Sequence, residues 1–409
     1  MLLTSCPYQY FLQRYNFFYC FFHYFCAVKN SIFHNRIFYL YLLFSLIFIN
    51  TENLTAKTTD TISGRNIQVE VRTSYGFIVC HHPEMIYFRA HFPLYEVSVQ
   101  QATFGKHYWE ACINYPAVGV SFLYTGLGGF QELGEAYALY PYLSFNFLKS
   151  RRNQLNLKMG VVVGYITKTY DPKENPKNTF IGDHYNAIIS LAFEYNRFIT
   201  NRFSLAVFTG FTHFSNGARR SPNNGINIAH IGLSAKYFIN EPKQHIPRME
   251  KNNAQYKPWT KKNLSLYVAF TYAPKDIEEY IGYNKTWSVY NLEIDCLKRV
   301  TEMSKIGLGF DFVFDETDKA ILDLDHKTYS DIEILRPGVN VAYELSLNTT
   351  SFMVYAGVHL AGKEMGGGRL YQKLSAKQNI CKHMFAICTL TTHFGWADFF
   401  SFGIGYKIN

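Results

Sequence analysis

A histidine and a serine two residues apart, His213 and Ser215, are the residues of this chain whose types and spacing best suit nucleophilic chemistry. A serine hydroxyl is a weak nucleophile until a neighbouring base removes its proton. Side chains at positions i and i+2 of a β-strand point to the same face of that strand. Alternation of residue types predicts a strand over 203–215, so the two side chains should lie next to each other.

The face that carries His213 and Ser215 is the apolar face of its strand, since Leu205, Val207 and Phe211 share it. In the next strand, expected over 227–239, Asn227 also lies on the apolar face, together with Ala229, Ile231, Leu233 and Tyr237. The two strands should pair as a hairpin, so the three polar side chains converge. Polar groups on an apolar face cost free energy unless they are bonded or used. The trio is therefore a candidate catalytic site.

The elements that would position this trio are the strands of a transmembrane β-barrel. Aromatic residues make up 18% of the 409-residue chain and charged residues only 17%, while the mean hydropathy is slightly negative. This balance does not suit a helical membrane protein, and it is typical of barrels with alternating apolar residues and aromatic girdles. A soluble β-sandwich rich in aromatic residues is the alternative that composition alone leaves open.

Period-2 alternation recurs along the chain from about residue 67, and it is clearest over 155–166. It predicts eight antiparallel strands before residue 240 and about eight weaker ones after residue 262, in runs long enough to cross a bilayer. The fold class is therefore an all-β, antiparallel outer-membrane β-barrel. Short turns at 149–153 and 200–202 indicate the periplasmic side, which places the loop after Ser215 on the outer side.

The ends of the two halves resemble each other, with Thr212-His213-Phe214-Ser215 in one and Thr392-His393-Phe394-Gly395 in the other. This suggests a duplication of eight strands. It is compatible with one barrel of about 16 strands or with two units of eight. Because no long flexible linker separates the halves, we expect the single barrel.

A basic stretch followed by the apolar run 37–49 predicts a secretory signal peptide, and residues before it suggest an over-extended start. The expected organisation is an over-extended start and signal peptide over 1–56, a barrel region with the Ser–His site over 57–240, a polar connection over 241–262, and further barrel strands ending in a closing strand over 263–409. Export implies the bacterial outer membrane as the location.

The run His213-Phe214-Ser215-Asn216-Gly217, followed by Ser221-Pro222-Asn223-Asn224-Gly225-Ile226-Asn227, resembles the signature of the PagL-type lipid A 3-O-deacylases, or acyloxyacyl hydrolases. The resemblance spans about residues 65–240. It implies a Ser–His–acid site with Ser215 as nucleophile and His213 as general base, and Asn216 with a backbone amide as oxyanion stabiliser. The acid of the family falls on Asn227. An amide can orient an imidazole but cannot stabilise its charged form by charge.

The resemblance also implies lipid A of the outer leaflet as substrate and partner. Arg219 and Arg220 could contact its phosphates, although solvated loop positions explain them equally well. Asp183, next to His184, could supply the missing acid. No metal, cofactor or nucleic acid is expected, and the oligomeric state is open.

The five cysteines after residue 56 show no CxxC spacing, so neither a zinc site nor a disulfide framework is indicated. A bridge between Cys80 and Cys112 stays open.

Two functions follow from these features. The first is an outer-membrane serine esterase that hydrolyses an acyl ester of lipid A. The second is a non-catalytic barrel, a porin or a surface-binding protein. A wide polar lumen would favour the porin, and a filled one the esterase.

Overall fold

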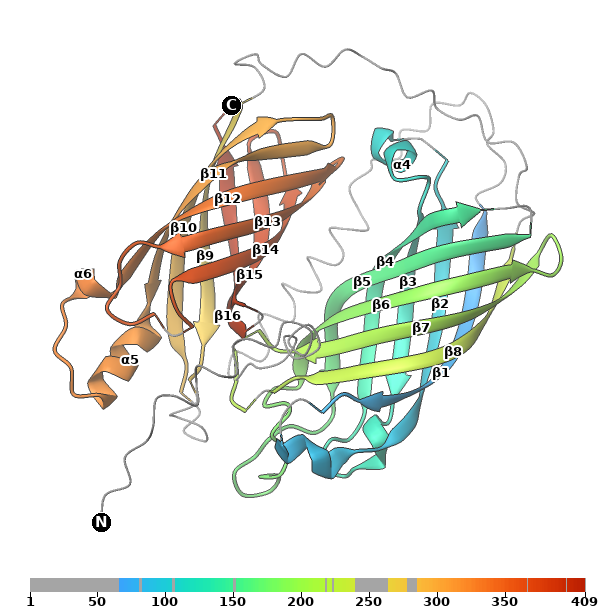
Figure 1. The fold of residues 1–409 in the computed structure, drawn as a ribbon, viewed down its shortest axis with the longest axis horizontal. Coiled ribbons are helices and arrows are strands. Elements are labelled where there is room, and N and C mark those ends of the chain that lie inside the picture. The colour runs from blue at the N-terminus through green and yellow to red at the C-terminus, as the bar shows by residue number, and fades with distance from the viewer. Residues whose placement is uncertain are drawn as a thin grey trace.

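The computed structural model describes residues 66–80, 83–104, 107–149, 152–217, 219–222, 224–239, 264–277, 285–365, 367–394 and 396–408. The expected signal peptide and the connection over 241–262 lie outside these residues. Within them, the chain forms sixteen strands that close into two separate barrels of eight strands each, shown in blue to yellow and in yellow to red (Figure 1).

The first barrel is a meander in which every strand pairs with its neighbours in sequence, and the last strand returns to the first. Its strands are β1 (Ile67–Ile78), β2 (His91–Ala102), β3 (Ala117–Thr125), β4 (Ala136–Lys149), β5 (Asn153–Ile166), β6 (Tyr185–Phe198), β7 (Phe203–Ser215) and β8 (Ile226–Phe238). Closure runs along the whole of β1 and β8, from Gln68 opposite Phe238 to Ile78 opposite Ile228.

The second barrel repeats this topology with its own eight strands. They are β9 (Leu264–Lys275), β10 (Trp287–Arg299), β11 (Ser304–Asp315), β12 (Leu335–Leu347), β13 (Thr350–His359), β14 (Leu370–Asn379), β15 (Met384–His393) and β16 (Trp396–Lys407). It closes where β16 pairs with β9, from Phe402 opposite Tyr272 to Lys407 opposite Tyr267.

The expectation of a single 16-strand barrel is therefore wrong, although the strands expected over 203–215 and 227–239 agree with those observed to within one residue. Alternation along a strand is the same in a barrel of eight as in a barrel of 16, so it cannot reveal which strand an edge finds as its partner. Eight strands leave an interior just wide enough for side chains to fill. Both interiors here are filled in that way.

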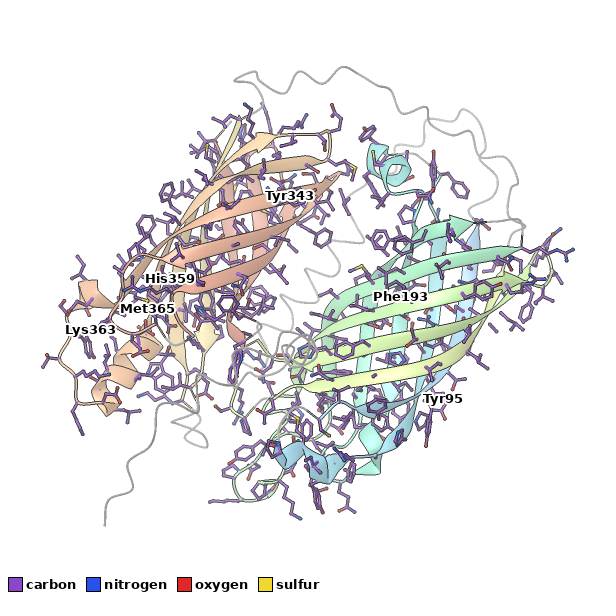
Figure 2. The ribbon with its side chains drawn as sticks, in the orientation of Figure 1. Tyr95, Phe193, Tyr343, His359, Lys363 and Met365 are labelled. Atoms are coloured by element: carbon purple, nitrogen blue, oxygen red, sulfur yellow. The ribbon has the colours of Figure 1, made fainter. Side chains whose placement is uncertain are left out.

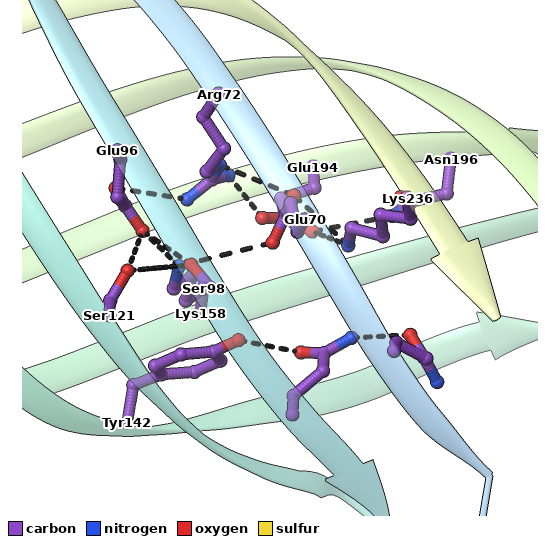
Figure 3. Close-up of polar contacts among 12 residues, drawn as sticks. Glu70, Arg72, Glu96, Ser98, Ser121, Tyr142, Lys158, Glu194, Asn196 and Lys236 are labelled. Atoms are coloured by element: carbon purple, nitrogen blue, oxygen red, sulfur yellow. Dashed lines mark hydrogen bonds and ion pairs between the residues drawn. The ribbon is translucent and has the colours of Figure 1, made fainter. Parts of the chain in front are cut away.

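The lumen of the first barrel holds three carboxylates and three cations in contact with one another (Figure 3). Arg72 bonds Glu194 and lies 3.4 Å from Glu70, while Lys236 bonds Glu194 at 2.7 Å. Lys158 bonds Glu96, and these two residues complete the group of six. Equal numbers of opposite charges let these groups remain buried without an unpaired charge.

Above this network an apolar cluster fills the end of the first barrel that carries the long connections. Its members include Phe88, Leu127, Phe180, Phe214 and Ile226, each almost completely buried. The lumen of this barrel is thus occupied by ion pairs at mid-height and by apolar side chains at the outer end.

The second lumen is filled by three clusters of ion pairs. Lys373 bridges Glu293 and Asp311, and Glu344 joins Lys305 and Lys377. At the outer end, Arg336 is buried among carboxylates and lies 2.6 Å from Asp315, 2.8 Å from Asp318 and 3.2 Å from Asp398. Asp318 belongs to the helix α5 (Glu316–Leu324), which lies in the longest connection of this barrel with the short helix α6 (Asp331–Ile334).

The outer walls carry the apolar side chains of the strands, which alternate along each strand with the side chains that point into the lumen. Tyr95 and Phe193 project from the first barrel and Tyr343 from the second, and all three are well exposed (Figure 2). Apolar side chains outside and paired charges inside are the arrangement of a barrel that crosses a bilayer. Among the described residues, the helices are all too short or too polar to span a membrane.

Connections differ in length between the two rims of each barrel. In the first, those over 79–90, 126–135, 167–184 and 216–225 lie at one rim, while the other rim carries 150–152 and 199–202 and one longer connection, 103–116, with the helix α4 (Tyr108–Cys112). We call the first rim the outer rim, because barrels of this class have long loops outside and short turns in the periplasm.

Cys80 and Cys112 are free thiols, so they form no bridge.

Candidate active site

His213 and Ser215 lie at the C-terminal end of β7, and Asn227 is the second residue of β8. The register of the hairpin places His213 directly opposite Asn227. The alternation from Leu205 and Val207, both exposed on the outer wall, continues to His213 and Ser215. The structure therefore brings the three residues together on the outer wall, near the outer rim.

The ring of His213 is oriented by a hydrogen bond, with Nδ1 2.7 Å from Oδ1 of Asn227. An amide oxygen can only accept, so Nδ1 carries the proton and donates it. The other ring nitrogen, Nε2, is then the basic one of the neutral ring. Asn227 thus selects the tautomer in which His213 can act as a base toward a neighbouring hydroxyl.

These three residues are far more buried than the rest of their face. Their exposed fractions are 6% for His213, 9% for Ser215 and 1% for Asn227, against 45% for Val207. The polar trio is therefore shielded, while the apolar wall nearer the bilayer centre is open. Shielding from water strengthens a hydrogen bond such as that from His213 to Asn227.

Asn216 shapes the loop that follows β7. Its Oδ1 accepts the backbone N–H groups of Arg219 and Arg220 at 3.2 and 3.3 Å, and its Nδ2 donates to the Arg220 carbonyl at 3.1 Å. The next residue, Gly217, has a φ of +65°, which favours glycine. The side chain expected to stabilise an oxyanion is thus engaged within its own loop.

The two arginines expected near a phosphate have different surroundings. Arg219 is buried and forms an ion pair with Asp183, which is itself fully buried. Arg220 is half-buried, and burial lowers the pKa of its guanidinium. Asp183, proposed as an alternative acid, is engaged with Arg219, while the ring nitrogen of His213 meets Asn227.

The loop over 216–225 also contacts the second barrel. The Ser221 backbone N–H donates to Oδ2 of Asp276 at 3.1 Å, and its hydroxyl donates to the Ile277 carbonyl at 3.4 Å. A Cβ at Gly217 would lie 2.6 Å from Cβ of Phe400 on β16. Sequence reasoning missed Asp276 and Phe400, because no local pattern signals a contact between residues so far apart in the chain.

The apparent copy of the motif in the second half does not form a second site. His393 ends β15 on the inward face, where Nε2 lies 3.2 Å from Asp398 and Nδ1 meets the Leu370 carbonyl at 2.8 Å. His213 points outward from the corresponding seventh strand. The two histidines therefore occupy opposite faces, and Gly395 lies outside the described residues.

Two family models match the chain. Residues 94–236 match the model described as lipid A 3-O-deacylase (PagL), and residues 262–409 match the model described as the C-terminal domain of acyloxyacyl hydrolase. The two matches are separated by residues 237–261 and together account for most of the chain. No curated protein matches the sequence.

Solved structures with some similarity include a surface protein, an outer membrane enzyme and a porin by description. Neisserial surface protein A is 7% identical with a TM-score of 0.31, covering 42% of this chain and 97% of that one. The outer membrane enzyme PagL is 14% identical with a TM-score of 0.28, covering 40% and 97%. A mutant Rh. blastica porin is 7% identical with a TM-score of 0.18, covering 84% and 99%. At these sequence identities and TM-scores, the similarities support no conclusion about this chain.

Proposed function

Because the chain belongs to the family of PagL-type lipid A deacylases and acyloxyacyl hydrolases, we propose that it is a serine esterase that removes an acyl chain from lipid A. The observation that carries this proposal is the hydrogen bond from His213 to Asn227, beside Ser215, on the outer wall at the outer rim. Family membership and the two barrels also locate the protein in the bacterial outer membrane.

In the proposed reaction, Nε2 of His213 takes the proton of the Ser215 hydroxyl as its oxygen attacks the ester carbonyl carbon. The bond between that carbon and the alcohol oxygen of the sugar then breaks, and His213 returns the proton to the departing oxygen. Water, deprotonated by His213, attacks the acyl-serine, the bond from the acyl carbon to the Ser215 oxygen breaks, and His213 returns the proton to that oxygen as the fatty acid leaves. The cycle needs no group beyond those of the chain and a water molecule.

Negative charge develops on the carbonyl oxygen during both attacks, and donors placed at that point lower the barrier. We assign this role to the segment Asn216–Gly217, which directly follows the nucleophile. Since the Asn216 side chain bonds the Arg220 carbonyl, backbone N–H groups are the simpler donors here. Asn216 then acts mainly by holding the loop in shape.

Asn227 takes the place of the acid implied by the family resemblance. It orients His213 and selects its tautomer, but it adds no negative charge to stabilise the imidazolium formed during attack. The expected consequence is an active enzyme whose rate lies below that of an otherwise identical site with a carboxylate.

The location of the trio fits a substrate that resides in the bilayer. An ester of an outer-leaflet glycolipid lies just below the head group, at the level of a residue close to the outer rim. The exposed apolar wall below Ser215, with Val207 and Leu205, would face the acyl chains. Arg220, half-buried in the adjoining loop, is the better placed of the two arginines to meet a phosphate.

The alternative of a porin is disfavoured by the interiors of the barrels. Each lumen is occupied by buried ion pairs, such as Arg72 with Glu194 and Arg336 with Asp315. A conducting pore needs an open aqueous path, which wider barrels provide.

The test is mass spectrometry of lipid A from cells that express the wild type, Ser215→Ala or Thr209→Ala. Thr209 lies on the same outward face of β7 and also carries a hydroxyl, so its variant is the matched control. We expect the wild type and Thr209→Ala to remove one acyl chain and Ser215→Ala to remove none. A Ser215→Ala variant that still deacylates would overturn the assignment of the nucleophile.

A further inference from the structure

The second barrel meets the first directly beside the catalytic trio. The contact here includes Ser221 with Asp276 and Ile277, and Gly217 with Phe400. Gly217 is two residues from Ser215 in the chain. The outer wall of β16 therefore begins next to the nucleophile, at the outer rim.

On that wall, the outward side chains of β16 change from half-buried to exposed along the strand. Phe400 and Phe402 are half-buried and pack edge to face, with ring centroids 4.7 Å apart. Ile404 and Tyr406, further from the rim, are exposed at 59% and 50%. The half-buried part of this face thus lies at the end that carries the site.

The first barrel shows the same gradient on β8. Asn227 is buried at the rim, whereas Ile231 and Leu233 are exposed at 62% and 64%. Each barrel therefore presents an apolar surface that starts at the site and continues along its wall. In a bilayer, both surfaces face hydrocarbon.

The acyl chain of an ester held at Ser215 would lie within reach of these surfaces, and a chain packed against fixed side chains gains dispersion contacts. The aromatic pair of Phe400 and Phe402 is the rigid apolar feature of the second barrel closest to Gly217 along β16. Aromatic rings offer a large apolar area with few rotatable bonds.

We propose that Phe400 and Phe402 form the acyl-chain-binding surface of the site, so that the second barrel selects the chain that the first barrel cuts. This inference rests on the proposed function of Ser215 and His213. It assigns the second barrel a part in substrate selection.

The test uses the purified full-length protein in detergent with 4-nitrophenyl esters of increasing acyl-chain length. Phe400→Ala and Phe402→Ala are compared with Leu308→Ala, which removes an exposed apolar side chain from the outward face of β11, away from the site. Phe400→Leu provides a milder change should the alanine variant fail to fold. Heat-dependent gel mobility checks that each barrel is folded.

For the phenylalanine variants we expect kcat/KM to fall about tenfold for long esters. The loss should grow with chain length, appear mainly in KM and leave the shortest ester unaffected. Leu308→Ala should keep the wild-type profile. An equal loss at every chain length, no change, or a gain at every chain length would each overturn the inference.

Ser215→Ala, assayed with the same esters, separates this inference from the proposed function. Residual turnover in that variant would remove the proposed function and the inference with it. Complete loss in Ser215→Ala, together with a flat chain-length profile in the phenylalanine variants, would remove the inference alone.

Discussion

His213 and Asn227 face each other across the β7–β8 pair, with Nδ1 of the imidazole 2.7 Å from the amide oxygen. The geometry is that of an oriented general base, but the partner carries no charge. Replacing the Asn227 amide by a carboxylate keeps a partner that orients His213 and adds a negative charge, so the two effects can be measured separately.

We expect Asn227→Asp to raise kcat, by roughly tenfold, because a carboxylate stabilises the imidazolium formed as Ser215 attacks. Asn227→Ala should lower kcat about a hundredfold through loss of orientation. Ester hydrolysis by purified protein over a range of pH measures both effects. Asn153→Asp, which adds the same charge at the start of β5, is the control and should leave kcat unchanged. A slower Asn227→Asp enzyme would contradict this role for Asn227.

Asp276 should matter for catalysis although it belongs to the second barrel. Its carboxylate accepts the Ser221 backbone N–H at 3.1 Å and so holds the loop that follows the nucleophile. Asp276→Ala removes this acceptor, and we expect kcat to fall by about tenfold as the loop loses its position. Asp276→Asn keeps an acceptor oxygen and should retain most of the activity. Equal rates in both variants and the wild type would show that the loop needs no support from the second barrel.

Arg219 should contribute chiefly to stability, since its guanidinium is paired with the buried carboxylate of Asp183. Arg219→Ala leaves that carboxylate without its cation, and we expect a loss of about 3 kcal/mol in the free energy of unfolding. Urea unfolding in the presence of lipid vesicles measures it. The double variant with Asp183→Ala should recover part of the loss. If Arg219→Ala unfolds like the wild type, the ion pair does not contribute to the free energy of unfolding. A contact between Arg219 and a phosphate is then the better explanation of this residue.

The outer end of the second barrel should respond to pH through Asp318. Three carboxylates, those of Asp315, Asp318 and Asp398, share the cations of Arg336 and Lys275, and burial raises the pKa of Asp318 to about 7. The folded state then holds a proton that the unfolded state releases near pH 4. Stability should therefore fall as pH rises from about 4 through 7.

Thermal unfolding of the detergent-solubilised protein across this pH range measures the effect. Asp318→Asn, which resembles the protonated group, should flatten the decline. Stability that instead rises between pH 4 and 7 in the wild type, with no change in Asp318→Asn, would exclude Asp318 as the group that holds the proton.

Local pattern determined much of this protein from sequence alone. Alternation with period 2 is a property of each strand by itself, so it located the strands and placed His213, Ser215 and Asn227 on outward faces. Pairing of these neighbouring strands as a hairpin then predicted that Asn227 would meet His213, and the register places the two residues opposite each other. These inferences need only residues within a few tens of positions of one another.

Tertiary structure decided the rest, because it depends on partners distant in the chain. β8 closes on β1 instead of continuing into β9 as expected, and the closed unit encloses paired charges such as Arg72 and Glu194. The engagement of Arg219 by Asp183 and the approach of Phe400 to Gly217 likewise join separate elements. The alternation of residue types along a strand does not encode such pairings. They depend on packing and charge compensation between elements that meet only in the folded barrels.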